Sequence, residues 1–241
     1  MAFDTTGEVY LFVLGQDPDQ SENRTRARRV YTPGIRLLRS PKRGDSDLDV
    51  EVVLQGGDLY PNSADSDLHV FAQFVHATFG YTFDVPWSPR VSAELDYASG
   101  ERNADDGRWG RFNTLFGPRR ADFGPTGEFG LLGRENIISQ GLRFVVKPIA
   151  RFDAFVSDRA NFLDSRTDVF ARSGVEDPTG QSGRFAGHQI ELRTRLWLLQ
   201  NVILWELGGA VFLNGEFMRT APDVNGYGDP LYVYSDLGFV F

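Results

Sequence analysis

Apolar and polar residues alternate along most of this chain, so that every second side chain is apolar over many short runs. A period of two is the pattern of a β-strand whose two faces meet different surroundings. The run at 231–241 has polar or small residues at most even positions. Its odd positions hold Leu231, Val233, Leu237, Phe239 and Phe241, with Ser235 as the polar exception. This run predicts a strand with one apolar face.

Ten such segments are predicted to be strands, separated by stretches rich in turn residues. They cover residues 8–15, 29–38, 48–57, 68–83, 90–99, 138–149, 152–163, 187–199, 202–214 and 231–241. The connections after the second, fourth, sixth and eighth strands are short. Those after the first, fifth, seventh and ninth are long, and the third is intermediate.

Short turns on one rim and long loops on the other are typical of outer-membrane β-barrels, whereas a β-sandwich has no reason to separate them. The sequence therefore predicts an all-β fold, an antiparallel transmembrane β-barrel of about ten strands in one domain over residues 1–241. An even number of strands puts both termini on the short-turn side. The alternative is a soluble sheet whose charged face contacts water.

Composition agrees with this prediction and excludes other classes. The chain has no Cys, which rules out a disulfide framework or thiolate metal site, and its net charge of −8 argues against nucleic acid as a partner. The chain contains no run of 18 apolar residues, so no transmembrane helix is predicted. Residues 1–8 show no signal peptide, which an outer-membrane protein needs, so we expect a replaced start or a truncated chain.

Charges of both signs occupy the second parity of several strands. In the strand at 187–199, apolar residues such as Ile190 and Leu192 alternate with Glu191, Arg193 and Arg195. The strands at 90–99 and 138–149 repeat the pattern. In a barrel, this parity faces the lumen.

Three segments and the final strand together resemble the alginate export family of outer-membrane porins. The segments are 94–107 (ELDYASGERNADDG), 111–117 (RFNTLFG) and 187–195 (GHQIELRTR). The resemblance covers most of the chain and corresponds to the C-terminal half of the family. It implies an 18-stranded monomeric barrel that exports a polyanionic uronate polymer through an arginine-rich constriction. This chain supplies only ten strands, too few for a wide aqueous channel if they close on themselves. It is therefore a fragment of a wider barrel or a reduced relative.

A polyuronate needs fixed positive charge along its path, and arginine can pair two carboxylate oxygens at once. We expect Arg193 and Arg195 to point together into the lumen as a ladder. The alternative is that the arginines pair with neighbouring acids and neutralise the lumen. The arginine-rich loop at 100–137 either folds inward and narrows the pore or lies exposed. The candidate lumen or constriction residues are Arg36, Arg108, Arg111, Arg119, Arg120, Arg143, Lys147, Arg193, Arg195, Glu94, Asp96 and Glu191.

Catalysis and metal chemistry fit poorly. Glu94 and Asp96 project in parallel from one strand, whereas a glycosidase needs carboxyls that face each other across a cleft. The three histidines match no metal motif. We expect no enzymatic activity and no cofactor, with Ca²⁺ at the acidic turns near Asp17 and Asp45 on an outer rim as a weak alternative.

We therefore predict an outer-membrane pore for export of an anionic polysaccharide in a Gram-negative bacterium. Its expected partners are that polysaccharide, outer-membrane lipid, and the barrel-assembly machinery through the strand that ends at Phe241. The resemblance to the family implies a further partner, a periplasmic polymer-synthesis complex. The alternatives are a general diffusion porin for small solutes and a glycan-binding β-domain that transports nothing.

Overall fold

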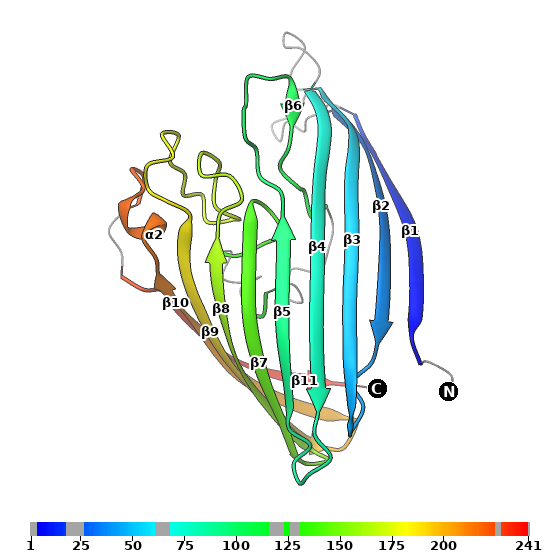
Figure 1. Cartoon of the computed structure of the whole chain (residues 1–241). Helices are drawn as coiled ribbons and strands as arrows, with labels where there is room; N and C mark the ends of the chain where they lie inside the picture. The colour runs from blue at the N-terminus through cyan, green and yellow to red at the C-terminus, as the bar shows by residue number, and fades with distance from the viewer. Residues whose placement is uncertain are drawn as a thin grey trace.

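The computed structural model describes residues 4–17, 27–60, 68–115, 123–125, 131–224 and 228–240. They form one antiparallel sheet in the order β1-β2-β3-β4-β5-β7-β8-β9-β10-β11, with β6 paired in parallel to β4 (Figure 1). The strands are β1 (Thr6–Gln16), β2 (Ala27–Arg39), β3 (Asp45–Tyr60), β4 (Leu68–Thr82), β5 (Arg90–Ala98), β6 (Arg108–Trp109), β7 (Ile137–Ile149), β8 (Phe152–Phe162), β9 (Phe185–Leu199), β10 (Ile203–Asn214) and β11 (Leu231–Phe239). A single helical turn, α2 (Phe217–Thr220), follows β10.

All ten predicted strands are confirmed, because alternating side chains are the strongest local signal for a strand. The largest difference in their bounds is at β3, which runs three residues further at each end than predicted. The sequence did not predict β6 or α2, which span two and four residues and are too short to show a period. Within the described residues the sheet is an open, curved wall, with β1 and β11 as its edges (Figure 1).

The two rims differ as predicted. Figure 1 shows the short turns at one end of the wall and the long connections at the other. The turn between β9 and β10 closes with a hydrogen bond from the Val202 N–H to the Leu199 carbonyl, and Asn201 adopts a φ of 60°. Asn tolerates this left-handed conformation better than most residues do. Local turn chemistry thus favours the tight connection between β9 and β10.

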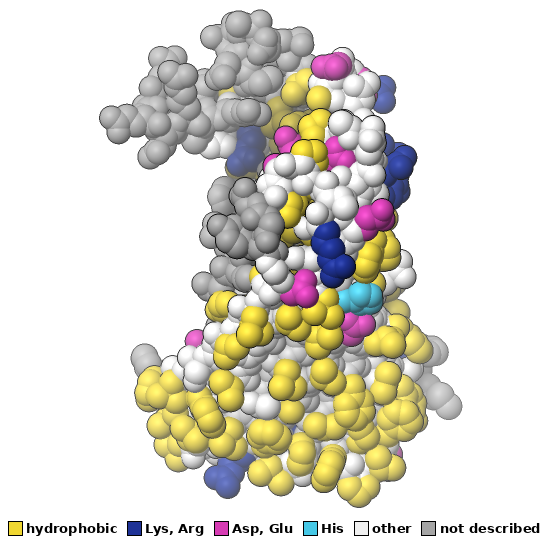
Figure 2. Space-filling view, turned by 90° about the vertical axis from the view of Figure 1, so that its left-hand side faces the viewer, with side chains coloured by type: hydrophobic (Ala, Val, Ile, Leu, Met, Phe, Trp, Pro, Cys, Tyr) yellow, Lys and Arg dark blue, Asp and Glu magenta, His cyan; other side chains and the backbone are white. Residues whose placement is uncertain are grey.

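The convex face of the wall is apolar and exposed. Leu142 on β7, Leu192 on β9 and Val233 on β11 are 64%, 56% and 66% exposed, respectively. Figure 2 shows apolar side chains in a broad band around the short-turn end, and more polar and charged side chains beyond it. Soluble proteins rarely expose an apolar surface of this extent. No helix in the described part of the chain is long and apolar enough to cross a membrane.

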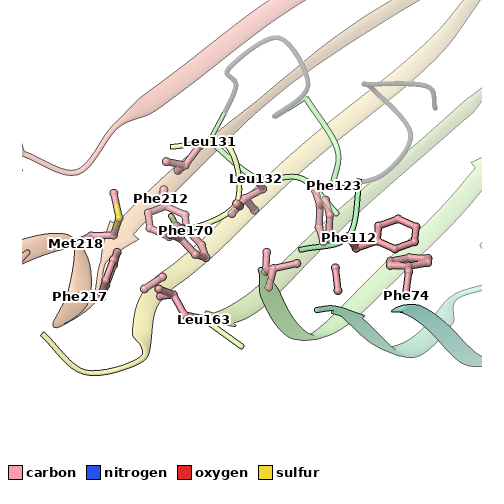
Figure 3. Close-up of a cluster of buried hydrophobic side chains, with 14 of the residues drawn as sticks. Phe74, Phe112, Phe123, Leu131, Leu132, Leu163, Phe170, Phe212, Phe217 and Met218 are labelled. Carbon is pink, nitrogen blue, oxygen red and sulfur yellow. The ribbon is translucent and has the colours of Figure 1, made fainter. Parts of the chain in front are cut away.

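The buried apolar core lies on the concave side, near the long loops. Phe74 on β4 and Phe212 on β10 point inward and contact side chains of the connecting loops (Figure 3). Phe112 belongs to the connection between β5 and β7, and Phe170 to the one between β8 and β9; their ring centroids lie 5.5 Å from Phe74 and 6.4 Å from Phe212, respectively. The described parts of these loops therefore fold against the inside of the wall.

Candidate functional site

The inward parity of the strands forms a concave face that is densely charged. The burial pattern of each strand and the register between strands place these side chains on the same side. Its ionisable members include Arg36, Asp47, Asp49, Glu51, His76, Arg90, Glu94, Asp96, Arg143, Lys147, Asp153, Arg159, Glu191, Arg193, Arg195 and Glu206. Acids and bases thus share this face in similar numbers, strand after strand.

A buried ion network occupies the middle of the concave face. Arg159 on β8 is 3% exposed and donates to Asp96 at 2.7 Å and to Glu94, both on β5. Arg143 on β7 approaches the same Glu94 at 2.9 Å, and His76 on β4 contacts Asp96 at 2.6 Å. Buried charges need partners of this kind, because an unpaired charge in a dry site is very costly.

Inward glycines make these contacts across strands geometrically possible. Gly141 on β7 lies between Glu94 on β5 and Arg159 on β8 in the strand register. A Cβ at Gly141 would stand 2.6 Å from Arg159 Cγ, so only glycine lets the arginine cross β7. Gly80 on β4 is similarly crowded by Arg90 and Asp47, which pair over it at 2.5 Å.

The acids of β3 form a column along the inside of the wall. Asp47 accepts from Arg90, and Asp49 accepts two hydrogen bonds from Arg36, at 2.7 and 2.8 Å. Glu51 accepts from the hydroxyl of Tyr10 at 2.6 Å. None of these three acids was among the residues predicted to line the lumen, although their shared odd parity was a visible signal. Asp49 and Asp47 thus neutralise arginines of β2 and β5, and Glu51 lies 3.7 Å from Arg134 of the long loop.

The expected ladder of Arg193 and Arg195 is only partly seen in the geometry. Both arginines do share the concave face, but Arg195 donates to Asp153 on β8 at 3.0 Å. Arg193 makes no ion pair among the described residues, and its buried Nε has no hydrogen-bond partner there. Its guanidinium lies 4.5 Å from the ring centroid of Phe155, and Arg143 lies at the same distance from that ring. Because β7 and β9 flank β8, the two cations approach Phe155 from its two neighbouring strands.

The structure places the other candidate residues apart from one another. Lys147 is exposed near the short-turn end, whereas Arg108 is exposed on β6 at the opposite rim. Arg111 pairs with the buried Asp168 of the loop between β8 and β9. Glu191 is 2% exposed and lies against Gly124 of the long loop. Arg119 and Arg120 lie outside the described residues.

The alternative in which arginines pair with neighbouring acids agrees with the geometry at several positions. Arg143 pairs with Glu94, and Arg159 pairs with both Glu94 and Asp96. The sequence had no means of choosing these partners, because the choice depends on which strands are neighbours and on the register between them. Asp153, the partner of Arg195, was not among the acids expected to form such pairs.

The expected position of the acidic turn near Asp45, on an outer rim, is not where the structure places it. Asp45 begins β3 at the short-turn end, where it pairs with Arg39. Asp47, two residues on, pairs with Arg90 inside the wall. Over the described ranges, no group of three or more His, Cys, Asp or Glu side chains could hold a metal ion. The other acidic turn, near Asp17, continues into residues 18–26, which lie outside the described residues.

An antiparallel sheet with an apolar convex face and an ionised concave face has the two-faced pattern of a membrane β-barrel wall. The family model for alginate export matches residues 4–227, which is most of the chain. The chain therefore belongs to the alginate export family, a family of outer-membrane porins. No curated protein matches the chain.

Proposed function

We propose that this chain forms part of an outer-membrane pore that exports an anionic polysaccharide of the polyuronate type. The observation that carries the proposal is Arg193, a cation on the concave face that forms no direct salt bridge among the described residues, with the carboxylates of Glu191 and Glu206 nearby. Arginine suits this role, since its guanidinium stays protonated and binds a carboxylate through two parallel hydrogen bonds.

The paired cations around Arg193 serve a different purpose from Arg193 itself. Arg143 is fixed by Glu94, and Arg195 is fixed by Asp153. Their charge is largely neutralised, so they hold the shape of the face and limit how tightly a polymer binds. A pore for a long polyanion needs such weak and repeated binding, because conduction requires that the substrate also leave each site.

The loops folded against the concave face narrow this path at the long-loop end. Gln189 Nε2 donates to the Phe123 carbonyl at 3.1 Å, and the guanidinium of Arg159 lies 5.5 Å from the Phe123 ring. The loop between β5 and β7 is thereby joined to the inner surfaces of β8 and β9. We propose that it forms the constriction of the pore.

The experiment that tests the proposal is polymer block of conductance in planar bilayers. The full chain is refolded in detergent, checked for heat-modifiable gel mobility, and exposed to polyuronate. Arg193→Gln is expected to weaken the block about tenfold or more, because a hydrogen bond to a charged group contributes about 1.5–3 kcal/mol. Arg166→Gln, which changes an exposed loop arginine, is the control and is expected to leave the block unchanged. An equal effect of both substitutions would contradict the role of Arg193.

A general diffusion porin for small solutes is the second candidate. The similar numbers of acids and bases on the concave face favour it, because such a face selects weakly for anions. The two functions differ in how block depends on polymer length. For an exporter, long polyuronates are expected to block at lower concentration of sugar units than short ones. For a diffusion porin, length is expected to have no such effect.

The proposed partners follow from the location. Outer-membrane lipid would contact the apolar convex face, and the barrel-assembly machinery would bind at β11, whose Leu231, Val233 and Leu237 point outward. Phe241 lies outside the described residues. A periplasmic polymer-synthesis complex would deliver the polysaccharide to the short-turn rim.

A further inference from the structure

A cavity of about 330 Å³ lies on the concave face near the long-loop end, away from the buried ion network. The strands β1 to β4 form one side of it, and β6 with the residues that follow forms the other. Its polar and aromatic lining residues are Gln16, Arg28, Gln55, Trp109 and Asn113, and its apolar lining residues are Val30, Leu59, Val70 and Leu115. The volume is at the lower end of the range for small-molecule sites.

Two hydrogen bonds and one aromatic contact hold the cavity in a fixed shape. The Gln55 side chain donates to the Asn113 carbonyl at 2.8 Å and accepts from the Asn113 N–H at 2.9 Å. Phe112, the residue before Asn113, packs on Phe74 inside the wall. These contacts attach the loop that carries Trp109 to the inner surfaces of β3 and β4. The site therefore needs little reorganisation when a ligand binds.

Leu115 adopts an unfavourable backbone conformation beside this cavity. Its φ of 56° lies in the left-handed region, which is costly for a residue with a Cβ. The Asn113 side chain accepts a hydrogen bond from the Leu115 N–H at 2.8 Å and helps to hold the conformation. Backbone strain of this kind is concentrated at ligand sites, where the surrounding structure maintains it.

Arg28 supplies the charge of the cavity. Its Nε donates to Gln16 at 2.7 Å, which orients the guanidinium, and it makes no ion pair among the described residues. The remaining N–H groups of Arg28 can therefore donate to an anion. Trp109 is partly exposed, and the guanidinium of Arg111 lies 5.7 Å from its ring centroid.

We propose that this cavity is a sugar subsite that takes one hexuronate ring of the exported polymer. The inference rests on the proposed function and names a second contact point, further toward the long-loop rim than Arg193. The apolar face of the sugar ring packs on Trp109, its carboxylate pairs with Arg28, and its hydroxyl groups exchange hydrogen bonds with the side-chain amide of Gln16. The Gln55 amide is buried and already bonded to Asn113, so it supports the site without contacting the sugar. A neutral hexose would use the same aromatic and amide contacts without the ion pair.

The test is direct binding, measured without transport. The full chain in detergent is titrated calorimetrically with a 1,4-linked hexuronate tetramer and, separately, with a neutral 1,4-linked hexose tetramer. Arg28→Gln is expected to weaken uronate binding about tenfold and to leave the neutral tetramer unaffected. Arg29→Gln changes the adjacent residue, which points to the convex face, and is the matched control with no expected change.

Trp109 gives a second readout at the same site. Uronate binding is expected to change the tryptophan fluorescence of the unaltered chain, and Trp109→Phe is expected to remove most of that change. Trp109→Ala is expected to weaken both tetramers about tenfold. Heat-modifiable gel mobility is used to check that each variant is folded. If Trp109→Ala does not fold, the fluorescence of Trp109→Phe still tests the site.

The outcomes separate this subsite from the proposed function. Equal uronate affinity for Arg28→Gln and Arg29→Gln, or no tetramer binding to the unaltered chain, overturns the subsite. If long polyuronate still blocks conductance in that case, the proposed function stands and only the subsite fails. If block is absent as well, both fail.

Discussion

At the scale of single residues, the concave face depends on side chains that reach across an intervening strand. Arg159 reaches Glu94 over Gly141, and Arg90 reaches Asp47 over Gly80. Each glycine lies on the inward parity, where a side chain would block the contact. Inward glycines in a barrel strand are therefore positions at which long side chains from neighbouring strands meet.

Arg159 is the residue whose loss is expected to destabilise the wall most directly. Arg159→Met leaves Glu94 and Asp96 buried without this partner, and breaking a buried ion pair on one side costs about 3–5 kcal/mol. The measurement is urea unfolding of the chain in lipid vesicles, followed by tryptophan fluorescence. Arg166→Met, at an exposed loop position, is the control and is expected to change stability by less than about 0.5 kcal/mol. Similar unfolding midpoints for the two variants would mean that the network contributes little.

At the scale of elements, the loop between β8 and β9 contains its own organising residue. The carboxylate of Asp177 accepts hydrogen bonds from the Thr179 hydroxyl at 2.6 Å, the Thr179 N–H at 2.9 Å and the Ser182 N–H at 2.7 Å. The bond from the Thr179 side chain, together with those from Ser182, holds the pKa of Asp177 well below its usual range. The folded loop therefore binds a proton less readily than the unfolded loop.

The sign of this shift gives a prediction about pH. The stabilising contribution of Asp177 is complete above the unfolded pKa near 4, and it is lost as the pH falls from there toward the depressed value. Hydrogen exchange at the amides of Thr179 and Ser182 is therefore expected to lose protection below about pH 4, beyond the intrinsic pH dependence of exchange. Asp177→Asn is expected to lower protection already at neutral pH, whereas Asp105→Asn in an exposed loop leaves it unchanged. Protection that stays constant down to pH 2 in the unaltered chain would disprove this assignment.

Among the strands, the sequence predicted which residues share a face but not which residues pair across strands. The parity of β9 was predicted correctly, because Ile190 and Leu192 alternate with Glu191 and Arg193 whatever the neighbours are. The partner of Arg195 was not predictable, because Asp153 comes opposite it only through the register between β8 and β9. The two residues of β6 carry no pattern, and they pair with β4 only because the loop is packed against the wall.

At the scale of the whole molecule, the wall separates two environments. Its convex face exposes apolar side chains in a band (Figure 2). Its concave face holds the ion network. The outer edges of β1 and β11 are unpaired within the described residues. Hydrocarbon offers no hydrogen bonds to a strand edge, so in a bilayer both edges need strand partners.

The cost of a charge on the convex face is expected to depend on its height in the band. Leu207 points outward from the middle of β10, and Leu207→Arg is expected to cost about 2–4 kcal/mol of stability in vesicles. His188 also points outward, near the long-loop end of β9, where it contacts Asp158 at 3.1 Å. His188→Arg is expected to cost about 0–1 kcal/mol, since charges near the interface remain hydrated. Equal costs at the two heights, measured by urea unfolding, would mean that the band does not contact lipid.

Local patterns in the amino-acid sequence were sufficient to predict the strands, the parity of each strand and the separation of short turns from long loops. All three are local properties: alternation is set by the backbone geometry of a strand, and turns are set by residues such as Asn201. The pairing of charges, by contrast, depends on the folded sheet, which brings some acids and bases together and keeps others apart. Arg193 and Arg195 look alike in the sequence, yet the register brings Asp153 to one of them and Phe155 to the other. Pairing across strands depends on distances of a few ångströms between residues far apart in the chain, and those distances exist only once the sheet has formed.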